Sequence, residues 1–156
     1  MLVLADPPPA TVSPSAPPLD SLRSTPHQTL IALPSEDARV SSARRFTADM
    51  LRRWGIAEDT RDSAVLIVSE LVSNAARHGH ADTTLFLTLN DCMLQIAVAD
   101  SGAPVAHQHA HADSDPDEHG RGTGIVEFLA QWIEIHHSES GRQVHVGLRV
   151  ADPQPC

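Results

Sequence analysis

Three side chains that could do chemistry recur every four residues between positions 70 and 79. Glu70, Asn74 and His78 supply a carboxylate, a carboxamide and an imidazole. At 3.6 residues per turn, this spacing places all three along one side of a helix. Asn is a poor residue for a helix interior, because its side chain competes for backbone hydrogen bonds. Taken alone, the triple fits a solvated helix edge as well as it fits a polar site.

A second segment with chemical potential is Asp100-Ser101-Gly102, which directly follows an apolar run. A carboxylate at the end of a strand can accept a hydrogen bond at the mouth of a pocket. A glycine two residues later lets the chain approach a flat ligand closely. Considered by itself, however, the segment is an ordinary turn at the end of a strand.

A third segment contains three alternating glycines, Gly120, Gly122 and Gly124. Glycines just before a helix let backbone N–H groups approach an anion, and the helix dipole favours negative charge there. The spacing matches neither the Walker loop nor the dinucleotide-binding fingerprint. We therefore expect a phosphate-binding loop of another kind, followed by a helix.

The hydrophobic pattern predicts the elements that position these segments. Apolar spacing and turn residues predict a strand at 29–33, a helix capped by Ser35 and ended by Gly55, and a second helix from Thr60 to Gly79. The pattern further predicts strands at 83–89 and 93–99, a helix at 125–130, and strands at 133–137 and 144–150. This order indicates an α/β two-layer sandwich. We expect a mainly antiparallel mixed sheet with about three helices on one face.

The composition limits the classes of partner. The formal net charge of −9 argues against direct nucleic acid binding, which requires clustered basic residues. The chain has no lysine, so all 11 basic residues are arginines. Any cation that meets a phosphate must therefore be an Arg, a protonated His or a metal ion.

The ends of the chain differ from its middle. Seven of the 12 prolines fall in the first 26 residues, so we expect a disordered tail at 1–26, one domain at 27–150 and a short C-terminal tail at 151–156. No apolar run is long enough to span a membrane, and residues 1–5 are too short for a secretion signal. The two cysteines, Cys92 and Cys156, do not indicate a disulfide framework. We expect a cytoplasmic protein that does not interact with membranes.

In this order, the three segments resemble the N-box, G1-box and G2-box of the Bergerat-fold (GHKL) ATPases. Within that family, the sequence is most similar to the anti-sigma-factor serine/threonine kinases and their actinobacterial single-domain relatives. The resemblance covers roughly Leu30 to Val150, and Glu70-Leu-Val-Ser-Asn74-Ala-Ala-Arg-His78-Gly79 is its most specific part. It implies the histidine-kinase-like ATPase fold.

The resemblance also implies roles for individual residues, with ATP and Mg²⁺ as cofactors. Asn74 would bind Mg²⁺, Glu70 would be the general base, and Asp100 would accept a hydrogen bond from the adenine amino group. Gly102 would lie beneath the base. The remaining residues that the resemblance assigns to the sugar and phosphates are Arg77, His78, Gly120, Arg121, Gly122, Thr123 and Gly124.

The sequence departs from the family pattern at three places. Pro104 replaces the second glycine of the G1-box, and Gln143 takes the place of a Thr that relatives often carry near the adenine. The intervening loop at 107–119 is rich in His and Asp, and we interpret it as a polar lid over the nucleotide. A transition-metal site formed by its alternating histidines is the less favoured alternative.

Two functions follow from the resemblance. The first is an ATP-dependent serine/threonine protein kinase that acts as an anti-sigma regulatory factor and phosphorylates an anti-anti-sigma protein. Its partners would be a sigma factor, the antagonist protein or both, with a homodimer by analogy with the family. The alternative is a non-catalytic nucleotide-binding regulatory module that acts by docking protein partners. A histidine kinase is disfavoured, because 156 residues leave no room for a dimerisation helix pair with a phospho-acceptor histidine.

Overall fold

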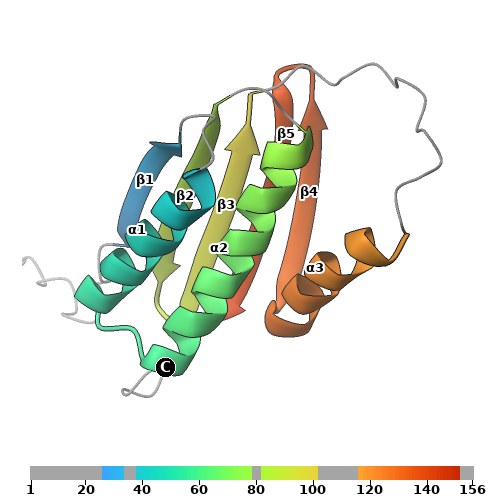
Figure 1. Cartoon of the computed structure of the whole chain (residues 1–156). Helices are drawn as coiled ribbons and strands as arrows, with labels where there is room; N and C mark the ends of the chain where they lie inside the picture. Colours follow the sequence, from blue (N-terminus) through green and yellow to red (C-terminus); the bar gives the residue numbers. More distant parts are fainter. Residues whose placement is uncertain (1–25, 34–37, 79–81, 102–115, 152–156) are drawn as a thin grey trace, which may run out of the picture.

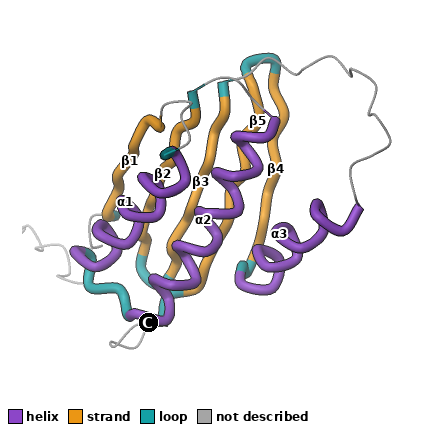
Figure 2. Tube along the Cα trace, in the orientation of Figure 1, coloured by secondary structure: helices purple, strands orange, loops and turns teal. Residues whose placement is uncertain are grey.

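The protein forms a five-stranded sheet with its helices on one face (Figures 1 and 2). The computed structural model describes residues 26–33, 38–78, 82–101 and 116–151. The elements in chain order are β1 (His27–Leu33), α1 (Arg39–Arg53), α2 (Glu58–His78), β2 (Thr83–Asn90), β3 (Met93–Asp100), α3 (Pro116–Leu129), β4 (Trp132–Ser138) and β5 (Gly141–Arg149).

The strand order across the sheet is β1-β2-β3-β5-β4, and every pairing is antiparallel. The predicted α/β two-layer sandwich is confirmed. The sheet contains no parallel pair among the described strands, so the expectation of a mixed sheet is too broad. Because β4 and β5 form a hairpin whose second strand pairs antiparallel with β3, the end of β3 lies next to the start of β5.

Strict alternation of side chains directs one face of the sheet toward the helices. In β2, Leu85 and Leu87 are buried, whereas Phe86 between them is exposed. The same period of two recurs in β3 and β5, as expected for antiparallel strands with one covered face. The buried residues of these two strands are Leu94, Ile96, Val98, Val144, Val146 and Leu148.

The helices bury residues at helical spacing against that face. In α1, Ala43, Thr47 and Leu51 are fully buried at intervals of four residues. Gly55 ends α1 with φ of +73°, a left-handed conformation that glycine adopts without strain. The proposed cap residue Ser35 lies outside the described residues, and Ala38 occupies the N-cap position. No helix in the described part of the chain is long and apolar enough to cross a membrane.

The third helix is longer than the sequence pattern predicts. It begins at Pro116 and continues to Leu129, so Gly120, Gly122 and Gly124 lie inside α3 and not in a loop before it. Each glycine in a helix interior costs about 1 kcal/mol relative to alanine, and for this reason the sequence pattern places the helix start after them. The observed start has its own signals, since a proline in the first turn and the acidic residues that follow it favour a helix N-terminus.

Cys92 lies in the turn between β2 and β3 and is disulfide-bonded, contrary to the expectation from the sequence. The chain returns to this turn after β5, because the main-chain N–H of Val150 donates to the carbonyl oxygen of Cys92 at 2.8 Å. The partner of Cys92 in the disulfide falls outside the described residues. Sequence spacing could not reveal the bond, because it depends on where the end of β5 lies in space.

Candidate functional site

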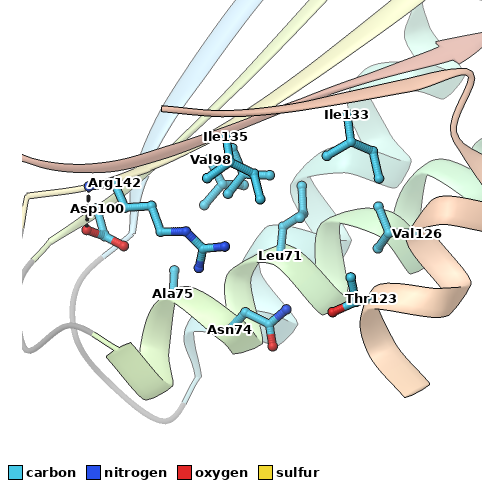
Figure 3. A pocket seen from close by; sticks show the side chains of 11 residues that line it. Leu71, Asn74, Ala75, Val98, Asp100, Thr123, Val126, Ile133, Ile135 and Arg142 are labelled. Atoms are coloured by element: carbon cyan, nitrogen blue, oxygen red, sulfur yellow. Dashed lines mark hydrogen bonds between the residues drawn. The ribbon is translucent and has the colours of Figure 1, made fainter. Parts of the chain in front are cut away.

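A pocket lies between α2, α3 and the strands β3, β5 and β4 (Figure 3). It brings together Asn74 from α2, Asp100 from the end of β3 and Thr123 from α3, one residue from each of the three segments that the sequence singled out. The remaining lining residues are Leu71, Ala75, Val98, Val126, Ile133, Ile135, Arg142 and Val144.

The walls of the pocket are apolar and its polar groups are few. Such a combination is typical of sites for flat ring systems, where apolar side chains hold the ring and polar groups fix its orientation. The free volume is about 50 Å³, below the roughly 300–1,000 Å³ of most ligand sites. A ligand as large as a nucleotide therefore requires side chains around the pocket to move.

Asn74 and Glu70 lie one helical turn apart on α2, and both are half-buried. Asn74 lines the pocket and offers a neutral carboxamide oxygen. Mg²⁺ in nucleotide sites commonly takes one or two protein oxygens and completes its octahedron with phosphate oxygens and water. The donor chemistry at Asn74 fits this requirement.

The carboxylate of Glu70 lies against Gly122 of α3. A Cβ built on Gly122 would overlap Oε2 of Glu70 and would lie 3.2 Å from its Cδ. Only a residue without a side chain lets α3 approach α2 this closely while Glu70 keeps its position. By contrast, a Cβ built on Gly124 would have no atom within 4 Å, so that glycine is not required by packing.

Asp100 is half-buried at the end of β3 and is held by the start of β5. Its Oδ1 accepts a hydrogen bond from the main-chain N–H of Arg142 at 3.1 Å. The preceding Gly141 has φ of +140°, and a Cβ there would overlap the carbonyl oxygen of Asp100. The glycine therefore lets β5 begin in direct contact with Asp100, and the hydrogen bond fixes the orientation of the carboxylate.

Arg142 is the charged residue of the pocket lining that the sequence motifs did not identify. Its side chain extends into the pocket from the side of Asp100 (Figure 3), and its Nε is buried without a hydrogen-bond partner. Gln143, which the resemblance places near the base, does not line this pocket and lies on the opposite face of the sheet beside Phe86 and His145. Val144 and Val146 are buried, so strand alternation could have placed Arg142 on the inner face.

The other residues assigned from the motifs either do not line the pocket or lie outside the described structure. Arg77 is exposed in the last turn of α2 and does not line the pocket. His78 ends α2, and Gly120 and Arg121 lie in α3, but their side-chain environments lie outside the described structure. Gly102, Pro104 and most of the His-rich loop also lie outside the described residues.

The comparisons with known proteins agree with this fold. Residues 33–148 match a family model described as histidine kinase-like ATPase domain. Among solved structures, the chain is similar to the crystal structure of the RsbU and RsbW domains of Rv1364c from Mycobacterium tuberculosis, with 19% sequence identity and a TM-score of 0.61. The match covers 80% of this chain and 32% of that chain, and at this identity it shows the fold alone. No curated protein matches the chain significantly.

Proposed function

The chain belongs to the histidine kinase-like ATPase domain family, and on that premise we propose that it is an ATP-dependent serine/threonine protein kinase that acts as an anti-sigma regulatory factor. The observation that carries the proposal is the convergence of Asn74, Asp100 and Thr123 on one apolar pocket. The N-box, G1-box and G2-box are far apart in the sequence. A bare structural role would not require one residue from each of them to line the same pocket.

The proposed binding mode assigns each end of the pocket to one part of ATP. Asp100, which can only accept hydrogen bonds when ionised, would receive the amino group of the adenine. The apolar residues between Leu71 and Val144 would hold the base, and Gly102 would lie beneath it. Asn74 would bind Mg²⁺, which neutralises phosphate charge when bound. Thr123 and the glycines of α3 would face the phosphates, with Arg77, His78 and Arg121 contributing charge.

In the proposed reaction, Glu70 acts as the general base. Glu70 accepts the proton of a serine or threonine hydroxyl as that oxygen bonds to the terminal phosphorus of ATP. The bond between this phosphorus and the bridging oxygen breaks, and ADP leaves with the electron pair. Phosphoryl transfer depends mainly on positioning and on stabilising charge, so few protein groups are needed. Glu70 lies one turn from Asn74, and both residues project from the same rigid helix, which fixes their separation.

The proposed partners are a sigma factor, an antagonist protein that is the phosphoryl acceptor, or both. This part of the proposal rests on the motif resemblance and on the fold shared with the structure of RsbU and RsbW domains. Residues 27–150 would form the nucleotide-binding domain, and it would act in the cytoplasm, as a homodimer by analogy with the family. The net charge of −9 makes a protein a better candidate partner than a nucleic acid.

One observation favours a second candidate, a nucleotide-binding module that acts only by docking partners. Glu70 does not line the pocket, and its Oε2 lies against Gly122 of α3. In this position the carboxylate is not part of the pocket wall. The kinase proposal therefore requires the Glu70 side chain or α3 to move on binding ATP or the acceptor protein, whereas the docking proposal does not.

The experiment that separates the two candidates is phosphoryl transfer from radiolabelled ATP to a candidate antagonist protein. Wild type should label the antagonist, and Glu70→Gln should reduce the rate by about 10²- to 10⁴-fold, the usual contribution of a general base. Glu70→Gln should still bind ATP. Measurable ATP binding by wild type without label transfer would contradict the kinase proposal and favour the docking module.

A further inference from the structure

Arg142 carries a buried donor atom without a hydrogen-bond partner, its Nε, where the side chain lines the pocket. Its Nε is buried and makes no hydrogen bond, and neither of the two ion pairs among the described residues includes it. A buried donor atom that lacks a partner costs free energy. Arg61 has a buried, unpaired Nε as well, but only Arg142 lines the pocket. A guanidinium can donate but cannot accept, so any ligand atom that it contacts must be an acceptor.

The position of Arg142 is fixed by Asp100. The two residues are directly paired in the β3–β5 ladder, and side chains of such a pair project from the same face of the sheet. The main-chain N–H of Arg142 occupies Oδ1 of Asp100, which leaves the other carboxylate oxygen for the ligand. The pocket therefore presents an acceptor and a set of donors side by side.

We propose that Arg142 is a base-recognition residue whose guanidinium donates to a ring nitrogen of the adenine that Asp100 holds by its amino group. The inference rests on the proposed nucleotide site and adds to it a residue that determines which base is accepted. The adenine amino group is flanked by N1 and N7, and both ring nitrogens are acceptors. An acceptor-only carboxylate beside a donor-only guanidinium matches this edge of the base.

A contact between Arg142 and the phosphates is the main competing assignment. The chain contains no lysine, and Arg142 is the one cationic side chain among the described residues that line the pocket. The two assignments differ in one measurable respect. A contact with the base stabilises adenosine and ATP equally, whereas a contact with the phosphates stabilises ATP alone.

The test compares the affinities of the full-length chain for adenosine and for ATP by calorimetry. Arg142→Met keeps the unbranched aliphatic part of the side chain and the main-chain N–H to Asp100 but removes the side-chain donors. We expect both affinities to fall by the same factor, about tenfold or more. Arg149→Met, an exposed arginine at the other end of β5, is the matched control and should bind both ligands as wild type does.

A second measurement compares ligands on the wild-type protein, so its main outcome does not depend on a variant that could fail to fold. Wild type should bind 1-deazaadenosine or 7-deazaadenosine about tenfold more weakly than adenosine, because one of these analogues lacks the acceptor for Arg142. In Arg142→Met that difference should disappear. Equal binding of adenosine and both analogues by wild type would overturn the inference, as would a loss in Arg142→Met that is confined to ATP.

The outcomes also separate this inference from the proposed function. Wild type that binds neither adenosine nor ATP contradicts the nucleotide site itself, and the role of Arg142 fails with it. Wild type that binds both, with Arg142→Met unchanged toward adenosine, leaves the proposed function intact and contradicts only the role of Arg142.

Discussion

Gly122 of α3 lies directly on the carboxylate of Glu70 of α2, so close that a Cβ on the glycine would overlap Oε2. This contact joins two of the three sequence motifs in space. It also means that the side chain proposed as the general base is controlled by the position of α3. A glycine-containing helix is a suitable element for such control, because its intrinsic helical stability is low.

The contact predicts that two alanine substitutions in α3, Gly122→Ala and Gly124→Ala, differ in their effect on the position of Glu70. Gly122→Ala should displace the end of the flexible Glu70 side chain, so that phosphoryl transfer falls by tenfold or more, the range expected when a general base is misplaced. The fold should survive, because alanine favours a helix by about 1 kcal/mol over glycine and offsets the cost of moving Glu70. Transfer rates and thermal unfolding midpoints of the two variants check this prediction.

Gly124→Ala is the comparison for Gly122→Ala, because both glycines lie in α3 and are proposed to face the phosphates, but only a Cβ at Gly122 would meet Glu70. A Cβ at position 124 has no atom within 4 Å, so this variant should gain helix stability without disturbing Glu70. Equal losses of transfer in both variants would show that the glycines act by keeping α3 flexible and not through contact with Glu70.

A second prediction concerns the hydrogen-bonding capacity of Asp100. In Asp100→Asn, the amide oxygen can still accept from the N–H of Arg142, and the amide NH₂ group then faces the adenine amino group, donor against donor. We expect ATP affinity to fall by tenfold or more, the usual loss for a hydrogen bond to a charged group.

Asp91→Asn makes the same chemical change at the other end of β3 and serves as the control in a titration with ATP. Asp91 is exposed in the β2–β3 turn with φ of 46°, a conformation that Asn tolerates well. Unchanged ATP binding by Asp100→Asn would remove Asp100 from the base site.

A third prediction distinguishes effects on the free energy of unfolding from effects on ATP affinity at two glycines of β5, Gly141 and Gly147. Gly141→Ala places a Cβ against the carbonyl oxygen of Asp100 at φ of +140°, which should cost about 1–3 kcal/mol in the free energy of unfolding. Because the same shift moves the N–H of Arg142 away from Asp100, ATP affinity should also fall. Urea denaturation and calorimetric titration measure the two effects.

Gly147→Ala is the comparison for this pair of measurements. Its Cβ would meet the indole ring of Trp132, so crowding should also destabilise the fold by about 1–3 kcal/mol. Gly147 faces away from the helices, between the buried Val146 and Leu148, so ATP affinity should be unchanged. A loss of affinity in Gly147→Ala as large as in Gly141→Ala would mean that binding follows stability alone.

Much of the fold could be predicted from local patterns. The patterns that depend only on neighbouring residues are confirmed. They are the alternation in β2 and β3, the helical spacing in α1 and α2, and the end of α1 at Gly55. The start of α3 was not predicted correctly, because tertiary contact with α2 outweighs the low helix propensity of its glycines. The disulfide of Cys92 likewise depends on a non-local return of the chain.

The candidate site shows the same division. Asn74 and Asp100 were identified from sequence and lie in one pocket, because their motifs lie at the ends of well-predicted elements. Arg142 was missed because no motif marks it, and the neighbouring Gln143 was chosen instead. A shift of one residue along a strand reverses the face on which a side chain lies. Arg142 therefore lines the pocket, whereas Gln143, the next residue, lies on the opposite face of the sheet.

The central claim is that Asn74 and Asp100 form one nucleotide site that uses Mg²⁺. The most direct measurement is the affinity for ATP with Mg²⁺ and with EDTA, in wild type, in Asn74→Ala and in Asn90→Ala, an exposed asparagine at the end of β2. Wild type and Asn90→Ala should bind ATP more tightly with Mg²⁺ than with EDTA. In Asn74→Ala the ratio of these two affinities should be about tenfold or more smaller than in wild type. Binding of Mg²⁺ and ATP by Asn74→Ala as tight as that of wild type would contradict the claim.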